Sequence, residues 1–208
     1  KISEESFMQG QDVVEDLKLR ASYGIAGNQA IGPYRTLGLL TEANTTLNGA
    51  EVPGLTLGRP ANPNLLWETT TSFDLALEAS LFDGRLFSEL NFYYKKTEDL
   101  LLDVAIPRQT GFTSQLQNIG SLENKGWEFL LNSRNIVKGD FRWSTDFNIS
   151  KNKNEVVALI NDADVFGNDA PSYFSVDRSY VLRVGEEVGV FWGFDYAGVY
   201  QGGDFPAG

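Results

Sequence analysis

Side chains that commonly carry out acid-base or metal chemistry are scarce in this sequence. Its 208 residues include no histidine and no cysteine. Histidine is the most frequent general base and metal ligand, and cysteine supplies nucleophiles, thiolate ligands and disulfides. Histidine-based triads, His-zinc and Cys-zinc sites and disulfide frameworks are therefore excluded. Any catalysis would have to depend on carboxylates, lysine or tyrosine.

Carboxylates are plentiful, and two groups of them have a spacing that a glycosidase could use. Glu186 is followed by Glu187, and Asp162 lies two residues before Asp164. Paired carboxylates are the groups that hydrolyse glycosidic bonds. On a chain with 28 acidic residues, however, carboxylates exposed to solvent are the ordinary explanation. We therefore expect that the chain is not an enzyme.

The segment Asp162–Asp169 is rich in oxygen ligands and contains Gly167, a combination that suits a calcium loop. The spacing of an EF-hand loop, with its terminal glutamate, is missing. A polar loop is the simpler interpretation. We expect no cofactor, and Ca²⁺ near Asp162–Asp169 remains the alternative.

An aromatic run near the C-terminus offers flat apolar faces on which sugar rings can stack. The candidate ligand contacts in this run are Trp192, Phe194 and Tyr196. Packing of these rings along a strand or beneath a loop is the alternative.

Composition narrows the class of partner. With 17 Lys and Arg against 28 Asp and Glu, the net charge is −11, so nucleic acid is not an expected partner. The first residues, Lys1 to Gln11, contain no apolar segment of a signal peptide, and no stretch reaches the ~18 apolar residues of a helical membrane span. Barrel strands are short and only half apolar, so this observation does not exclude them.

Strict alternation of apolar and polar residues predicts long antiparallel strands. From Thr69 to Leu81 the odd positions are mainly apolar, and the pattern resumes after Asp83-Gly84. An Asp-Gly pair between two alternating runs is a strong hairpin signal. A second pair of runs flanks Lys138-Gly139, and Leu17 to Ile25 alternates in the same way. The expected fold is all-β, an antiparallel meander with long hairpins.

The predicted connections are of two kinds. Those at Asp83-Gly84 and Lys138-Gly139 are tight, whereas those over residues 24–68, 97–125 and 161 onward are long. Tight turns at one end and long loops at the other are typical of a segment of a large transmembrane β-barrel. A soluble antiparallel sandwich also alternates. Its strands average about 5–6 residues, however, and the hairpin arms here keep their pattern for about ten or more.

Aromatic residues lie at a spacing that suits a membrane. Tyr94 is ten residues past Gly84, and Trp127 is eleven residues before Lys138. Ten residues span about 33 Å of strand, or about 25 Å of height once the strand is tilted. Phe82, Phe141 and Trp143 lie beside the tight turns. The aromatics would thus form a girdle at each edge of an apolar band.

Several segments resemble the C-terminal half of the barrel in SusC/RagA-type TonB-linked outer-membrane proteins. They are LKLRASYGIAGNQAIGPY from Leu17, NPNLLWETTTSFDLALEASLFDGRL from Asn62, YYKKTEDLLLDVAIPRQTGFTSQLQNIGSLENKGWEFLLNS from Tyr93, FRWSTDFNISKNKNEVVAL from Phe141 and VLRVGEEVGVFWGFDYAGVYQ from Val181. The resemblance covers most of the chain in the expected order.

This resemblance implies a plugged barrel of roughly 22 strands. It also implies TonB-dependent nutrient uptake at the bacterial outer membrane, of the Bacteroidetes type, with a SusD-like lipoprotein as partner and an oligosaccharide or peptide as substrate. Residues 1–208 include no plug domain, TonB box or terminal strands, so we expect a membrane protein fragment, a partial barrel of strands and extracellular loops. The alternative is a soluble all-β carbohydrate-binding module.

The barrel interpretation assigns the two faces of the strands. Residues predicted to face the lumen are Asp74, Glu78, Glu89, Asn91, Glu128, Arg134, Arg142 and Asp146. Residues predicted to face lipid are Leu75, Leu77, Leu90, Phe92, Tyr94, Trp127, Phe129, Trp143 and Phe147.

Overall fold

The computed structural model describes residues 1–29, 31–167, 179–193, 195 and 198–199, and within them strands make up most of the regular secondary structure. The strands are β1 (Val14–Asn28), β2 (Leu39–Leu47), β3 (Ala50–Arg59), β4 (Glu68–Leu81), β5 (Leu86–Glu98), β6 (Leu101–Ala105), β7 (Ser114–Asn118), β8 (Gly120–Lys138), β9 (Phe141–Leu159), β10 (Val165–Gly167), β11 (Tyr180–Leu182) and β12 (Val190–Phe191). Four short 3-10 helices are η1 (Ile2–Glu4), η2 (Ser6–Met8), η3 (Arg108–Thr110) and η4 (Ile160–Asp162). Within the described ranges, no helix has the length and apolar character needed to cross a membrane.

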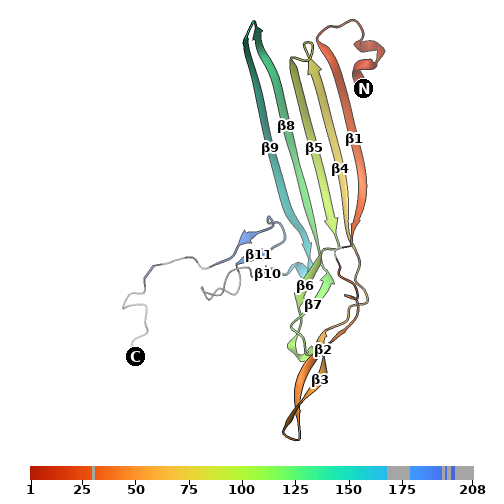
Figure 1. The fold of residues 1–208 in the computed structure, drawn as a ribbon, viewed down its shortest axis with the longest axis vertical. Helices are drawn as coiled ribbons and strands as arrows, with labels where there is room; N and C mark the ends of the chain where they lie inside the picture. Colours follow the sequence, from red (N-terminus) through yellow and green to blue (C-terminus); the bar gives the residue numbers. More distant parts are fainter. Residues whose placement is uncertain (30, 168–178, 194, 196–197, 200–208) are drawn as a thin grey trace.

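Five long strands form one antiparallel sheet in the order β1-β4-β5-β8-β9, and they run side by side in Figure 1. β8 and β9 each contain 19 residues, about three times the length usual in soluble proteins. The predicted antiparallel meander is confirmed. It is interrupted by excursions, since the chain leaves the sheet between β1 and β4 and again between β5 and β8.

Tight turns join the long hairpins at one end of the sheet, the upper end in Figure 1. In the β4–β5 turn, Asp83 and Gly84 have φ values of 56° and 69°, the left-handed region that glycine and aspartate tolerate best. In the β8–β9 turn, Gly139 has a φ of 60°. Both predicted hairpin turns are confirmed. We call this end of the sheet the turn end.

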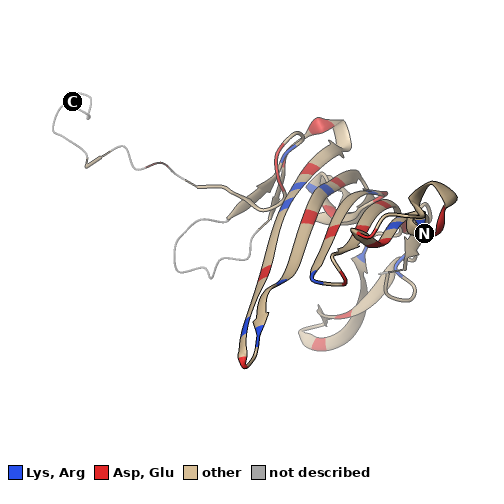
Figure 2. Cartoon of the chain, turned by 90° about the horizontal axis from the view of Figure 1, so that it is seen from above, with Lys and Arg blue, Asp and Glu red and all other residues tan. Residues whose placement is uncertain are grey.

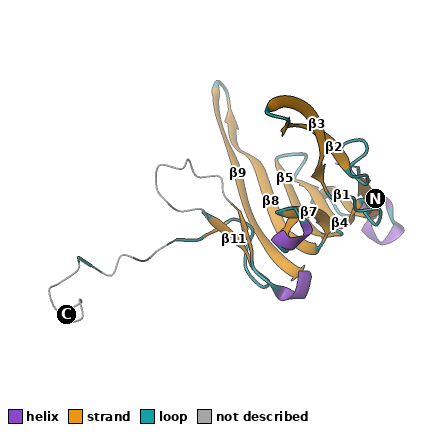
Figure 3. Cartoon of the chain, turned by 90° about the horizontal axis from the view of Figure 1, so that it is seen from below, coloured by secondary structure: helices purple, strands orange, loops and turns teal. Residues whose placement is uncertain are grey.

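The long connections gather at the opposite end of the sheet, which we call the loop end (Figures 1 and 3). They are less irregular than the sequence suggested, because β2 with β3 and β6 with β7 form hairpins of their own. The stretch 97–125, expected to be a connection, also contains the start of β8 at Gly120. A small sheet of β10, β11 and β12 follows β9.

Very little of the described chain is buried. The buried apolar residues are Ala76, Ile119, Val156, Leu159 and Val181. Soluble domains bury the apolar face of a sheet against a second layer. Here large side chains of the long strands, such as Leu19 and Phe92, stay 54% and 47% exposed. The sheet is therefore a single layer with both faces open.

The two outer strands of the large sheet have long free edges. β1 pairs with β4 alone, and β9 pairs with β8, among the described residues. Near the loop end β9 has another neighbour, since the Val156 amide donates to the Glu186 carbonyl at 2.9 Å and the Gly185 amide to the Val156 carbonyl at 2.8 Å. The sheet is not closed, as expected for part of a larger barrel.

Candidate functional site

The strand register sorts the side chains of the large sheet onto two faces. Directly paired residues of antiparallel strands share a face, and one such row joins Arg20, Ala76, Asn91, Glu128 and Ser150 across all five strands. We call this face the polar face and the other the apolar face. The polar face carries Asp74, Glu78, Glu89, Asn91, Glu128, Arg134, Arg142 and Asp146. The apolar face carries Leu75, Leu77, Leu90, Phe92, Tyr94, Trp127, Phe129, Trp143 and Phe147.

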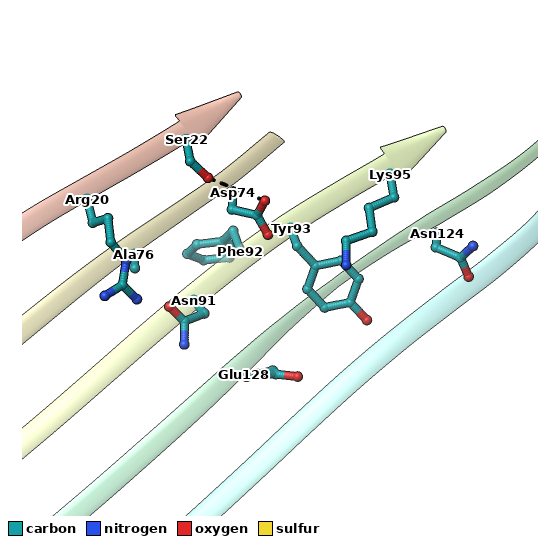
Figure 4. Close-up of a pocket in the computed structure, with 10 residues that line it drawn as sticks. All are labelled: Arg20, Ser22, Asp74, Ala76, Asn91, Phe92, Tyr93, Lys95, Asn124 and Glu128. Carbon is teal, nitrogen blue, oxygen red and sulfur yellow. Dashed lines mark hydrogen bonds between the residues drawn. The ribbon is translucent and has the colours of Figure 1, made fainter. Parts of the chain in front are cut away.

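A depression of 680 Å³ lies on the polar face over the middle of the sheet (Figure 4). The polar side chains around it are Arg20, Ser22, Asp74, Asn91, Tyr93, Lys95, Asn124 and Glu128. Ser22 donates to the Asp74 carboxylate at 3.5 Å, and the Lys95 ammonium lies 5.7 Å from the centre of the Tyr93 ring. The depression thus offers donors, acceptors and one aromatic face to a polar ligand.

An ion-pair ladder continues the polar face from the depression toward the turn end. Glu78 accepts from Lys18 at 3.0 Å and from Arg20, and Arg20 also donates to Glu89 at 3.3 Å. Exposed pairs of this kind contribute at most about 1 kcal/mol each to stability. Their structural effect is to fix the guanidinium of Arg20, which stays 51% exposed, beside the depression. Charged positions recur along all these strands (Figure 2).

Gly126 on β8 leaves room for the Tyr93 ring, which lies across it from β5. A Cβ atom at Gly126 would come within 2.7 Å of the Tyr93 hydroxyl oxygen and 2.5 Å of the Lys151 carbonyl oxygen. Any side chain there would displace Tyr93 or the β9 backbone. The glycine therefore sets the orientation of the one aromatic side chain with a hydroxyl in the depression.

The remaining residues predicted to face the lumen lie nearer the turn end. A second depression, of 320 Å³, shares Asn91 and Glu128 with the first. Beyond it, the Asn132 amide donates to Asp146 at 2.6 Å. Arg134 and Arg142 line neither depression. Five of the eight residues predicted to face the lumen, Asp74, Glu78, Glu89, Asn91 and Glu128, thus line a depression or join the ladder beside it.

Of the aromatic residues predicted to contact a ligand, only Trp192 falls within the described part of the chain. Its ring packs edge-on against Phe166, with the centroids 5.3 Å apart, and lies 5.7 Å from the Arg183 guanidinium carbon. Trp192 remains 43% exposed. Phe194 and Tyr196 lie outside the described residues, so the ligand-contact prediction stays a prediction.

The carboxylate of Asp164, in the segment that suggested a calcium loop, is held by Arg183. Arg183 donates to it from Nε at 3.0 Å and from Nη2 at 2.7 Å. These hydrogen bonds lower the pKa of the Asp164 carboxyl from its ordinary value. Across the described ranges, no group of three or more His, Cys, Asp or Glu residues could hold a metal ion. Asp169 lies outside those ranges, so the alternative of Ca²⁺ near Asp162–Asp169 stays untested.

Sequence reasoning left several residues of the depression out of the lumen-facing set. They are Arg20, Ser22, Tyr93 and Asn124. Alternation in β1 and β5 puts Arg20, Ser22 and Tyr93 on the polar side, so the signal was present.

Comparison with known proteins decides the class of this sheet. Residues 11–207 match the family model described as "TonB dependent receptor-like, beta-barrel". The chain belongs to the TonB-dependent receptor β-barrel family. The predicted resemblance to SusC/RagA-type proteins is confirmed, as is the fold class, a partial all-β barrel. TonB-dependent receptors are transport proteins without enzymatic activity, so no catalytic site is assigned.

The relatives of this TonB-dependent receptor chain include curated proteins and solved structures. It is 58% identical over 201 residues to a TonB-dependent receptor of Formosa agariphila, covering 97% of this chain and 20% of the relative. It is 40% identical over 193 residues to SusC of Bacteroides thetaiotaomicron, covering 90% of this chain and 18% of SusC. A structure of the RagAB peptide transporter superposes with a TM-score of 0.76 at 31% identity, covering 94% of this chain and 20% of that one. The chain therefore spans about a fifth of the length of these relatives.

Proposed function

We propose that this chain forms part of the wall and the extracellular loops of an outer-membrane, TonB-dependent nutrient transporter. In this proposal the apolar face contacts lipid and the polar face lines the lumen. The observation that carries it is the chemical contrast between the two faces of an open, single-layer sheet. A soluble protein would leave the apolar face in water, whereas a bilayer stabilises it.

The slope of the apolar band supports the membrane orientation. On the apolar face, the row of apolar side chains ends toward the loop end at Ile25 on β1 and at Ile149 on β9, where Lys151 follows. Through direct strand pairing, the residue of β1 that lies level with Ile149 is Leu19, six residues before Ile25. Six residues correspond to about 20 Å of strand, and the four strand spacings between β1 and β9 to about 19 Å. The band thus crosses the strands at about 45°, close to the ~35–45° tilt of barrel strands in a membrane.

Aromatic residues mark both edges of this band. Tyr94 and Trp127 lie at its loop-end edge, whereas Phe141 and Trp143 lie near the tight β8–β9 turn. All four are at least partly exposed, so their rings are free to meet the headgroup region. Amphipathic rings favour that region over both water and hydrocarbon.

The polar depression supports a polar substrate that passes along the lumen. Its amide, carboxylate, guanidinium and hydroxyl groups can form hydrogen bonds with either sugar hydroxyls or peptide groups. We propose an oligosaccharide or a peptide as the substrate class. The names of the relatives, SusC and the RagAB peptide transporter, are compatible with this choice.

We propose two protein partners for the full-length parent, a SusD-like lipoprotein on the loop side and TonB on the turn side. The likeness to SusC and to RagAB supports the lipoprotein. The loop-end hairpins β2–β3 and β6–β7 are the elements that such a lipoprotein would contact.

The alternative of a soluble carbohydrate-binding module has less support. Such a module needs a two-layer core, whereas five buried apolar residues are found in the described part of the chain. The Trp192 ring, which would carry sugar stacking, is packed against Phe166 and Arg183.

Uptake by whole cells tests the proposed function. Cells that carry or lack the full-length gene are given fluorescent oligosaccharides and fluorescent peptides, with and without a protonophore that abolishes TonB energisation. We expect gene-dependent accumulation of one class that the protonophore abolishes, and the protein in the outer-membrane fraction. Equal accumulation in both strains, or a protein recovered in the soluble fraction, would exclude the proposal.

A further inference from the structure

A cluster of lysines interrupts the apolar face at its loop-end edge. Lys125 on β8 is the direct register partner of Lys153 on β9, and Lys151 on β9 is the partner of Trp127 on β8. Directly paired residues have Cβ atoms about 4.5–5.5 Å apart. Three ammonium groups thus lie in one small patch, next to the Leu, Phe and Trp of the apolar band on the turn-end side and to Glu123 and Glu155 on the loop-end side.

The lysines surround a groove rather than a flat surface. This groove has a volume of 500 Å³, and its lining includes Lys125, Lys151 and Lys153 together with aromatic side chains. The aromatic residues of the apolar face that line it are Phe73, Phe92, Tyr94 and Trp127. An apolar floor with cations at one rim is complementary to a molecule that is anionic at one end and hydrocarbon at the other.

The charge of this patch is only partly balanced by the chain itself. Lys153 contacts Glu155 at 2.7 Å, and Lys125 lies 3.9 Å from Glu123, but both lysine side chains stay about half exposed, at 53% and 50%. Lys151 is exposed and forms no ion pair with another described residue. Three neighbouring cations repel one another, so an external anion that bridges them would be bound favourably.

We propose that this groove, the lysine groove, binds an outer-leaflet lipid whose headgroup carries phosphate. The phosphate lies among Lys125, Lys151 and Lys153, and the acyl chains run over Trp127 and Phe73 onto the apolar band. The inference rests on the proposed function, which puts this face toward lipid and the loop end outside the cell. Lysine ammonium groups bind phosphate as point charges, and their stems extend along the apolar surface to reach it.

Position favours a lipid over an acidic protein partner. The groove begins where the apolar band ends, so a ligand seated in it contacts hydrocarbon on one side and water on the other. A protein partner would need a second polar surface next to the lysines, but on the turn-end side the groove adjoins Leu75, Leu90 and Phe129 of the band. A lipid satisfies both environments with one molecule.

The test uses the full-length protein, purified in mild detergent, with bound lipid quantified by native mass spectrometry. The variants are Lys151→Gln alone, the triple change Lys125→Gln, Lys151→Gln and Lys153→Gln, and Lys138→Gln as matched control. Lys138 shares the apolar face but lies beside the β8–β9 turn, at the opposite edge of the band. Relative to the wild type, we expect the amount of phosphorylated lipid bound to the triple variant to fall about tenfold or more. Lys151→Gln should show a smaller loss, and Lys138→Gln should match the wild type.

A second arm identifies the source of the phosphate. Wild-type protein is reconstituted in phosphatidylcholine vesicles that contain phosphorylated lipid A or the same lipid after phosphatase treatment, and inorganic phosphate serves as competitor. We expect enrichment of the phosphorylated lipid around the protein, and no displacement by millimolar inorganic phosphate. Equal enrichment of both lipids, or displacement by free phosphate, would contradict a lipid site.

Failure of this inference can be told apart from failure of the proposed function. If the triple variant reaches the outer membrane and keeps its phosphorylated lipid, the lysine groove is not the site, and the transporter proposal stands. If the wild-type protein is absent from the outer membrane, both are wrong. Should the triple variant fail to assemble, Lys151→Gln decides the question, and unchanged lipid retention in it would refute the proposal.

Discussion

Leu77 and Glu78 are neighbours in the chain, yet the register puts them on opposite faces of β4. Leu77 pairs with Leu90 and is 40% exposed on the apolar face. Glu78 pairs with Glu89 on the polar face, where Lys18 and Arg20 neutralise it. This alternation of single residues underlies the account of the whole molecule. It makes the effect of a charge depend on which of two adjacent positions receives it.

A charge in the middle of the apolar band is expected to hinder assembly of the parent protein. Leu77→Arg or Phe129→Arg would bring arginine near the bilayer midplane, at a cost of about 2–4 kcal/mol. The matched control is Asn148→Arg, which adds the same charge to the polar face one position from Ile149, the register partner of Phe129. Urea unfolding of the full-length protein in liposomes measures the free energy. Equal destabilisation by all three changes would contradict the face assignment.

The ion pair between Asp164 and Arg183 is expected to hold the small β10–β12 sheet in a pH-dependent way. The hydrogen bonds from Arg183 lower the pKa of Asp164 in the folded state. The stabilisation is therefore fully present above the ordinary carboxyl pKa of about 4 and is lost as the pH falls through the lowered folded-state value.

Limited digestion with pepsin, which is active in acid, measures the protection of this segment. Cleavage is normalised at each pH to that of an unfolded substrate, and between pH 5 and pH 2 we expect normalised cleavage between β9 and β12 to rise in the wild type. In Arg183→Gln it should be high at every pH of the series. A wild-type profile as flat as that of the variant would show that the pair does not order the segment.

At the scale of elements, close packing between β5, β8 and β9 is expected to depend on Gly126. In Gly126→Ala the new methyl group would meet the Lys151 carbonyl and the Tyr93 hydroxyl, so we expect a loss of about 1–3 kcal/mol. Gly24 on β1 shares the polar face, and a Cβ there would meet only the Ser72 hydroxyl, at 3.8 Å. Gly24→Ala should therefore stabilise by about 0.5 kcal/mol. If Gly126→Ala and Gly24→Ala shift the unfolding midpoint by the same amount and in the same direction, steric crowding at Gly126 does not determine stability.

The long hairpins could be predicted from the sequence because their signals are local. Asp83-Gly84 and the alternation around it fix both the turn and the register of β4 against β5. The β2–β3 hairpin has a turn signal of the same kind in Asn48-Gly49, whose φ values are 53° and 81°, but the threonines of its flanking strands weaken the alternation of apolar and polar residues. The register shift between Arg134 and Ile136 had no local signal, since a bulge is defined by both strands.

The polar depression was harder to predict than the strands that form it. Its residues come from β1, β4, β5 and β8, and the pairing of β1 with β4 spans an excursion of some forty residues in the chain. Alternation shows which side chains share a face. It does not show that Arg20 lies level with Asn91 and Glu128, because that depends on long-range register.

At the scale of the whole molecule, the open sheet is expected to associate when residues 1–208 are produced alone. The free edges of β1 and β9 and the uncovered apolar face favour pairing with other copies. Without detergent, light scattering should detect large oligomers or aggregates, and detergent should reduce their size. A stable monomer in plain buffer would instead favour the soluble binding module.

The central claim, that one face of the sheet meets lipid and the other an aqueous lumen, is tested most directly by accessibility along β4. The chain contains no cysteine, so a single cysteine can be introduced and spin-labelled at each position from 74 to 79 in a cysteine-free full-length protein reconstituted in liposomes. Paramagnetic relaxation by oxygen, which concentrates in lipid, is compared with relaxation by a water-soluble nickel chelate. We predict that oxygen dominates at Leu75, Leu77 and Ala79, and the chelate at Asp74, Ala76 and Glu78. Accessibility without this two-residue period, or with the two sets exchanged, would contradict the account.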